Sequence, residues 1–275
     1  RIGFSALAGM VLFLSGCASV REAKRQPADI LFPYLLVEDI DKAGLNEPSG
    51  ICFHTRRGTL FVVGDDGDVV EIGTDGTLLH EKRIRAADFE GITHNPSTGL
   101  LYIAIEGEEV IIEINPDTLE ILHEFPLPRT LNGKTVLQSG GRGIEGITFV
   151  PDSDHQEGGT FYVANQALSL TDEHDLSVVV EVELPLRSDV GEAALIGYFT
   201  PEVIDLSGLH YDQATDHLFV TSDATNTIME YSRQNKLINA WALPGNNQEG
   251  ITFDSDGFAY IAQDSGGIIK LKGLQ

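Results

Sequence analysis

The sequence predicts an all-β fold, a five-bladed β-propeller with four-stranded blades, on three observations. Short runs of β-branched and aromatic residues alternate with turns rich in Gly, Asp, Asn and Pro, and sustained helical periodicity is missing beyond residue 29. A glycine followed by Ile or Leu recurs five times. Further strands follow each glycine, and four strands in roughly 40 to 60 residues are typical of a propeller blade.

The repeats align along their whole length. The glycine segments, each expected to be the first strand of a blade, are EPSGICF (47–53), DFEGITH (88–94), GIEGITF (143–149), DLSGLHY (205–211) and NQEGITF (247–253). Second strands are expected at 60–65, 101–106, 161–166, 218–223 and 259–264. Third strands are expected at 69–72, 110–114, 178–184, 227–231 and 268–272, and fourth strands at 78–84, 121–127, 194–199 and 237–243.

The last repeat lacks a fourth strand, and an unassigned strand, PYLLVEDI (33–40), precedes the first repeat. We therefore predict that Tyr34 to Ile40 supply the outer strand of the last blade and close the ring. A two-sheet sandwich is the alternative fold, but it explains neither the repeats nor the missing strand.

Composition limits the function. The chain of 275 residues carries 18 Lys and Arg against 42 Asp and Glu, a formal charge of −24. Because phosphate binding needs clustered cations, nucleic acid is not expected as a partner. Only Cys17 and Cys52 are present, which excludes a disulfide framework and a cysteine-rich zinc site.

The N-terminal segment has the features of a targeting signal. Residues 2–14 are apolar and uncharged but too few to cross a bilayer as a helix, so they match a secretory signal. The following Leu-Ser-Gly-Cys17 resembles the lipobox of bacterial lipoproteins, and Ala18 then implies the outer rather than the inner membrane. We expect a signal peptide at 1–16, a lipid-anchored tether at 17–29 and a periplasmic propeller at 30–275. A buried cysteine in a short core helix is the alternative.

In a propeller the first strand of each blade begins at the end of the axis where the second strand finishes. The residues before the five glycines are Ser49, Glu90, Glu145, Ser207 and Glu249. The last residues of the second strands are Asp65, Glu106, Gln166, Asp223 and Asp264. We expect these carboxylates, hydroxyls and amide to converge on one mouth of the axis.

Carboxylates held close together raise one another's pKa and destabilise the fold unless a cation compensates them. Calcium is the expected cation, because it accepts six to eight oxygen ligands in flexible geometry. Magnesium is possible but stricter in geometry, and a transition metal would lack nearby His or Cys. The alternative is that these side chains only cap loops and strand ends. Other candidate ligands are Asp66, Asp88, Asn165 and Asp205.

Further along the first strands lie Cys52, Thr93, Thr148, His210 and Thr252, which we expect to pack between blades. Cys52 is expected to be a buried thiol rather than a nucleophile, and His210 a core histidine rather than a general base.

Two long loops lie on the predicted acidic rim, at 128–143 and 167–177. Arg142 in the first loop is a candidate ligand-binding residue or the partner of a rim carboxylate. Long loops on a rigid rim are places where a protein partner or a small molecule would bind.

The repeated Glu-Gly-Ile-Thr, the five-blade count and the lipoprotein start resemble the SdiA-regulated (YjiK/CarP-like) family of bacterial envelope proteins, distantly related to NHL-repeat proteins. The resemblance runs over roughly 30–275 and implies a propeller with a calcium site and a link to calcium homeostasis. It implies no defined activity, so whether the chain is an enzyme stays open. We expect a non-enzymatic, calcium-responsive or partner-binding module. The alternative is a calcium-dependent hydrolase, lactonase-like or esterase-like rather than phytase-like, because the rim has few cations.

Overall fold

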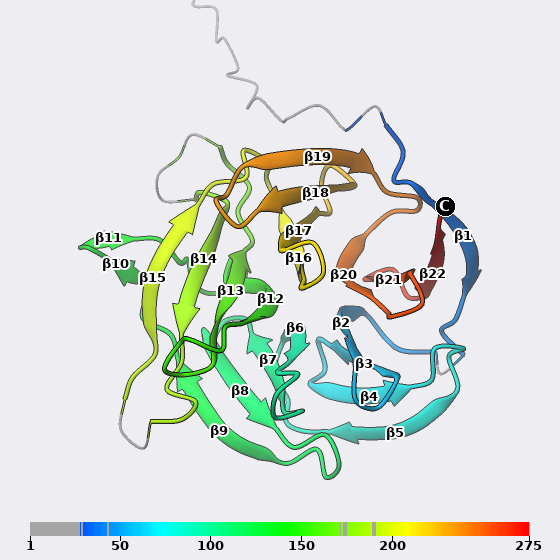
Figure 1. The fold of residues 1–275 in the computed structure, drawn as a ribbon, viewed down its shortest axis with the longest axis horizontal. Helices are drawn as coiled ribbons and strands as arrows, with labels where there is room; N and C mark the ends of the chain where they lie inside the picture. The colour runs from blue at the N-terminus through cyan, green and yellow to red at the C-terminus, as the bar shows by residue number, and fades with distance from the viewer. Residues whose placement is uncertain are drawn as a thin grey trace, which may run out of the picture.

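The computed structural model describes residues 28–274 except 29, 43, 171, 173, 174, 189 and 190. Five four-stranded antiparallel sheets stand around a central axis (Figure 1). The predicted five-bladed propeller is therefore confirmed. Within the part of the chain that the structure describes, no helix has the length and apolar character needed to cross a bilayer.

Each of the first four blades consists of consecutive strands. The first blade is β2 (Pro48–His54), β3 (Thr59–Gly64), β4 (Asp68–Ile72) and β5 (Leu78–Arg83), and the second is β6 (Phe89–His94), β7 (Leu101–Ile105), β8 (Val110–Ile114) and β9 (Ile121–Pro126). The third is β12 (Ile144–Pro151), β13 (Gly159–Asn165), β14 (Val178–Glu183) and β15 (Ala194–Phe199), and the fourth is β16 (Leu206–Asp212), β17 (His217–Ser222), β18 (Thr227–Ser232) and β19 (Leu237–Ala242).

The fifth blade joins the two ends of the chain. Its strands are β20 (Gln248–Phe253), β21 (Phe258–Gln263), β22 (Ile268–Gly273) and β1 (Tyr34–Asp39), and β1 pairs with β22 in antiparallel register. The Ile40 amide donates to the Ile268 carbonyl at 2.8 Å, and the Ile268 amide donates to the Asp39 carboxylate at 3.1 Å. The predicted ring closure is confirmed, and Figure 1 shows the blue β1 beside the red β22.

One short element was not predicted. The connection between the second and third blades contains a short hairpin whose strands have two residues each, β10 (Thr130–Leu131) paired with β11 (Lys134–Thr135). Two residues per strand are too few to produce a recognisable alternation in the sequence.

The hydrophobic core is divided among the blade interfaces. Phe61 and Val63 of the first blade, for example, pack with Phe89 and Ile103 of the second in one buried cluster. Four further clusters each join two neighbouring blades. Because every blade buries both faces of its sheet against its neighbours, middle strands such as β7 and β8 are almost continuously apolar rather than alternating.

The repeated glycines lie where the five inner strands approach one another around the axis. A methyl group at Gly50 would lie 2.2 Å from the Glu90 carbonyl oxygen, and one at Gly91 would lie 2.6 Å from the Glu145 carbonyl oxygen. The glycines of the other three inner strands have backbone atoms of the next strand within 2.4 to 3.0 Å of such a methyl. Any side chain here would push the strands apart, which is the physical reason for the repeat.

Threonines connect neighbouring inner strands by hydrogen bonds. The backbone amide of Phe53 donates to Thr252 Oγ1 at 3.0 Å, and that of Phe149 donates to Thr93 Oγ1 at 3.2 Å. Tyr211 donates to Thr148 in the same way at 3.0 Å. The expected role between blades is confirmed for these three threonines, and Cys52 is buried as predicted.

Every inner strand has a register irregularity at the same repeat position, immediately before or at its glycine. In β2 the pairing passes from Pro48 to Gly50 and leaves Ser49 without a partner across the ladder. Bulges of this kind bend a strand and re-aim a side chain. The residue before each glycine is thereby turned out of the regular alternation at the end of the axis where the inner strands begin.

We predict that Gly50→Ala destabilises the protein by about 1–3 kcal/mol or more, because its methyl group has no space between β2 and β6. Gly141→Ala is the matched control: a methyl group at Gly141 would meet no atom within 4 Å, and the backbone there is not left-handed, so a change below about 0.5 kcal/mol is expected. Urea unfolding of both variants measures the difference. Equal stability of the two variants would contradict the close-approach explanation.

Candidate metal site at the acidic mouth

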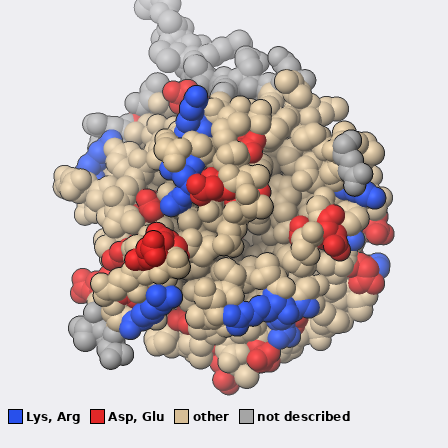
Figure 2. Space-filling view, in the orientation of Figure 1, with Lys and Arg blue, Asp and Glu red and all other residues tan. Residues whose placement is uncertain are grey.

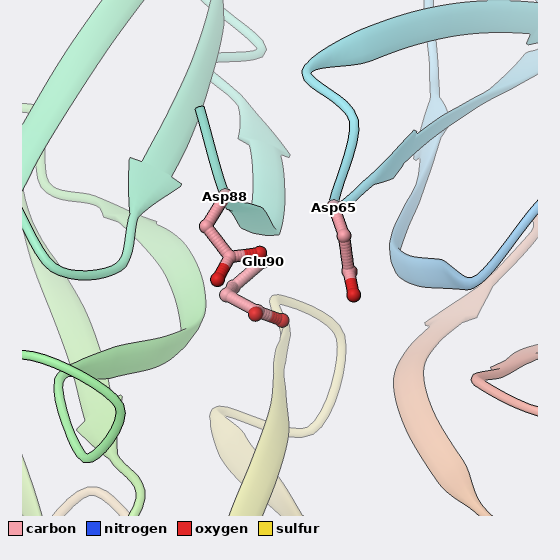
Figure 3. A group of neighbouring side chains, drawn as sticks. All are labelled: Asp65, Asp88 and Glu90. Atoms are coloured by element: carbon pink, nitrogen blue, oxygen red, sulfur yellow. The ribbon is translucent and has the colours of Figure 1, made fainter. Parts of the chain in front are cut away.

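Two overlapping groups of carboxylates lie at the end of the axis where the inner strands begin, here called the acidic mouth. One group is Asp65, Asp88 and Glu90, and the other is Glu90, Glu106 and Glu145. Within each group one oxygen of every side chain lies within 4.8 Å of the others. Figure 3 shows Asp88 and Glu90 of the second blade and Asp65 of the first directed into one space.

The fold places these side chains through the repeat. Glu90 and Glu145 precede the glycines of β6 and β12, at the register irregularities. Asp65 and Glu106 follow the last residues of β3 and β7 directly. Strand starts and strand ends therefore meet at one mouth, as the sequence predicted for these four acids. Asp88, considered only as an alternative ligand, joins them from the connection into β6.

The negative charge of the two groups is not compensated by basic side chains. Among the described residues, none of the five acids forms an ion pair with Lys, Arg or His. The nearby Arg85 pairs with Glu108 at 2.7 Å and with Glu124 at 3.1 Å instead. Asp88 Oδ1 is buried and has no hydrogen-bond partner. A buried anionic oxygen left without a donor is costly unless a cation or a proton satisfies it.

Burial and mutual repulsion shift the protonation of these acids. Desolvation raises the pKa of Glu90 and of Glu145 well above the usual carboxyl range, and neighbouring carboxylates add to the effect. Desolvation also raises the pKa of Glu106 and of Asp65, although hydrogen bonds from the Gly143 amide (3.0 Å) and the Ser49 hydroxyl (2.8 Å) favour their charged forms. Burial and repulsion thus favour the protonated forms of Glu90 and Glu145 when no cation is bound.

Three predicted acids occupy the rest of the mouth. The charge of Asp264 raises the pKa of Glu249, Asp223 and Asp65, and the charge of Asp223 also raises that of Glu249. Glu249, Asp223 and Asp264 do not belong to the two close groups. Desolvation first, and then Asp223 and Glu90, raise the pKa of Glu249 to about 9. Asp223 accepts a hydrogen bond from the Gln248 amide at 3.1 Å. These acids extend the negative field without completing a third group.

The predicted polar candidates mostly have structural partners. Ser49 donates to Asp65, whereas Ser207 donates to the Gln248 carbonyl at 2.8 Å. Asn165 is fully buried and holds the start of β14 and the loop before it, accepting from the Val178 amide and donating to the Leu176 carbonyl. The Gln166 amide donates to the Gly143 carbonyl at 3.0 Å. Among these candidates, only Ser49 contacts one of the grouped acids through its side chain.

The other predicted candidates interact with residues outside the two carboxylate groups. Arg142 forms an ion pair with Asp175 across the two long rim loops. Asp66 pairs with Arg83 at 3.2 Å, and Asp205 accepts from the Ala224 amide at 3.1 Å. His210 lies near the other end of β16, where it lines a cavity together with Cys52.

Glu109 lies beside the acidic mouth but was not among the candidates predicted from the sequence. It is buried in the turn after Glu106, its Oε1 has no hydrogen-bond partner, and desolvation raises its pKa. A methyl group on Gly143 would lie 2.7 Å from this oxygen, so the glycine leaves it room beside the mouth. The residue has no counterpart in the repeat, because it belongs to a turn and not to a strand end.

The donor set fits a hard divalent cation. All five grouped acids offer oxygen, neither His nor Cys takes part, and the orphaned Asp88 oxygen is available to a ligand. Such sets suit Ca²⁺ or Mg²⁺ better than a transition metal. The chemistry that these residues offer is cation binding with displacement of protons.

Comparisons with known proteins agree with this architecture. The model of the SdiA-regulated family matches residues 36–265. Glutaminyl cyclase from Myxococcus xanthus is similar in structure, with a TM-score of 0.60, 10% identity, and coverage of 88% of this chain and 97% of that one.

Two lyase structures resemble the chain more weakly. A streptogramin B lyase has a TM-score of 0.43 at 19% identity, covering 82% of this chain and 64% of that one. Virginiamycin B lyase from Staphylococcus aureus has a TM-score of 0.43 at 18% identity, covering 82% and 66%. Comparison with curated protein sequences gives no significant match.

We predict that the cation-free protein loses stability as pH rises. The pKa of Glu249 is about 9 in the folded state against 4.5 for an ordinary Glu, so the folded state holds more protons than the unfolded state between these pH values. The acids at the mouth therefore stabilise the fold below about pH 4.5, and this contribution is lost as pH rises toward 9. Thermal unfolding in EGTA across this range measures the slope.

Glu249→Gln should be the more stable protein in EGTA at pH 9, by at least about 1.4 kcal/mol, the value of one pKa unit. Glu192→Gln, a change at an exposed acid in the connection before β15, should follow the wild type. A Glu249→Gln variant whose stability had the same pH dependence as that of the wild type would contradict the assignment of this pH dependence to the acids of the mouth.

Proposed function

The chain belongs to the SdiA-regulated family, and we propose that its propeller is a calcium-binding module of a bacterial cell envelope. The observation that carries this proposal is the pair of overlapping carboxylate groups joined through Glu90, with a buried Asp88 oxygen that no donor satisfies. A cation bound there would relieve the repulsion and replace the protons that the acids otherwise hold.

Calcium suits this mouth better than magnesium. The acids come from the first, second and third blades, and they differ in burial from the buried Glu145 to the exposed Asp65. An irregular set of carboxylates drawn from separate strands favours an ion with variable coordination number, whereas Mg²⁺ demands near-ideal octahedral geometry. Exposure of Asp65 leaves one side of the site open to solvent or to a partner.

The N-terminal segment supports attachment to a membrane. Cys17 and the apolar run before it lie outside the described residues, and the proposal rests on their resemblance to a lipoprotein signal. Cleavage before Cys17 would leave a lipid-anchored tether and place the propeller in the periplasm, with Ala18 favouring the outer membrane. Calcium-dependent recruitment of a partner protein or a small molecule to the rim is then the function we infer, without catalysis.

A calcium-dependent hydrolase is the second candidate, because the exposed Asp65 side leaves room for a substrate at the metal. The basic residues nearest the mouth are engaged elsewhere, Arg85 with two acids and Arg142 with Asp175, which disfavours phosphate esters. His210, the histidine considered as a general base, lies toward the opposite end of the axis. Lactone or ester turnover abolished both by EGTA and by Glu145→Gln would overturn the non-enzymatic proposal.

We predict that calcium raises the melting temperature of the propeller. Ligand at a hundred times its Kd stabilises the native state by about 2.7 kcal/mol. Glu145→Gln should weaken calcium binding at least about tenfold, since it removes a charged ligand while preserving shape. Calorimetric titration in buffers of different ionisation enthalpy should also show proton release on binding at pH 7.

Glu192→Gln serves as the matched control and should bind calcium like the wild type. The absence of a melting shift at millimolar calcium, or an equal shift in Glu145→Gln, would refute the site. A stronger shift with magnesium than with calcium would reassign the cation.

We predict that Cys17→Ser releases the protein from membranes. In a Gram-negative host the wild type should incorporate labelled fatty acid and sediment with the outer membrane, whereas the variant should do neither. Cys52→Ser should remain lipidated, because Cys52 is buried in the propeller. Sedimentation of Cys17→Ser with the outer membrane would contradict lipid anchoring.

A further inference from the structure

The end of the axis opposite the acidic mouth contains a second site. The ring is hollowed at its centre, where the axis opens (Figure 2). At the ends of the inner strands, a cavity of about 240 Å³ is lined by residues of all five blades, among them Phe53, His94, Phe149, His210 and Phe253. This volume suits a small molecule and is below that of pockets for drug-sized ligands.

His210 occupies a position in the repeat where three other blades have threonine. Those threonines accept hydrogen bonds from backbone amides of the next blade. His210 makes no hydrogen bond within the described residues. Its ring packs against that of Phe253, with 5.0 Å between the ring centroids. Desolvation lowers the pKa of His210 to about 4, so the imidazole is neutral at pH 7. A neutral imidazole offers one donor and one acceptor, and the half-buried ring of His210 presents them at the cavity.

Much of the cavity wall is aromatic. Phe149, Tyr211 and Phe253 contribute rings. His94 accepts the Thr55 amide on Nε2 at 3.4 Å, which leaves its proton on Nδ1, and desolvation lowers its pKa to about 3, so it too is neutral. Flat apolar surfaces with a few fixed polar atoms favour a planar organic ligand.

The charge at the cavity is negative. Asp212 and Asp254 are lining residues, neither forms an ion pair within the part of the chain that is described, and both raise the pKa of the Tyr34 phenol, after desolvation. Lys and Arg are missing from the lining residues of the described chain. The adjacent Arg56 donates its guanidinium hydrogens to the carbonyls of the 96–98 loop. The site thus repels anions and attracts cations.

We propose that this cavity binds a small aromatic ammonium compound. Its ring would pack among the phenyl rings, its positive charge would compensate Asp212 and Asp254, and a hydrogen bond would satisfy His210. The site is independent of the acidic mouth, because the two lie at opposite ends of the inner strands. Calcium and the amine therefore bind without competing.

Calorimetry with three probes of one shape tests the proposal: 2-phenylethylamine as the cation, 2-phenylethanol as the neutral compound and phenylacetate as the anion. The wild type should bind the amine at least about tenfold more tightly than phenylacetate at pH 7, a difference of about 1.4 kcal/mol. Asp212→Asn should reduce the affinity for the amine more than that for the alcohol. The asparagine oxygen can still accept the hydrogen bond from the Ala214 amide, and the asparagine NH2 group can donate to the Thr215 hydroxyl, which donates to Asp212 in the wild type.

His210→Thr introduces the residue found in three other blades, so it should fold, and its melting temperature and calcium titration provide the check. It should weaken amine binding at least about tenfold, whereas Glu145→Gln at the acidic mouth should leave it unchanged. No saturable binding of any probe up to about 10 mM, equal affinity for amine and phenylacetate, or undiminished binding by a folded His210→Thr variant would each overturn the proposal.

Discussion

The structure depends on how closely five inner strands meet around one axis. At Gly50 the neighbouring carbonyl oxygen lies 2.2 Å from where a methyl group would be, so only a residue without a side chain permits that contact. The same constraint recurs at each inner strand and holds the five blades in register with one another. Because the glycine also adjoins a bulge, one short motif both packs the ring and turns the preceding residue toward the mouth.

The concentration of acids at one end follows from this arrangement. Three of the five positions before the glycines are glutamates, and strand-end acids lie beside them. Glu145 is buried and Glu90 is half-buried, so the packing that brings them together also removes water that would have screened their charge. The fold tolerates this repulsion because close backbone contacts and threonine hydrogen bonds hold the five inner strands together. The opposite end of the axis is lined by neutral histidines and aromatic rings.

Much of the fold was predictable because its determinants are periodic in the sequence. The glycine repeat located the inner strands, and the missing strand after 268–272 pointed to Tyr34–Ile40 as its replacement, which the structure places at Tyr34–Asp39. For the site, the sequence predicted only that the acids lie at the same end of the axis. Which acids group together depends on bulge geometry and on turns between strands, so Asp88 was given a minor role and Glu109 was missed. Asn165 stands at a strand end like the ligand candidates, yet its amide is engaged by the 176–178 backbone, a contact between loops that carries no repeat signal.

Closure of the ring by β1 and β22 also has a consequence for biosynthesis. The two strands of that pair are separated by more than two hundred residues, so a chain made from its N-terminus holds β1 ready long before β22 exists. Leu35, Leu36 and Val37 of β1 remain exposed even in the finished ring, and a nascent β1 would in addition present an unpaired edge. The last blade can therefore form only after β22 has been synthesised, which makes the pairing of β1 with β22 a late step in folding.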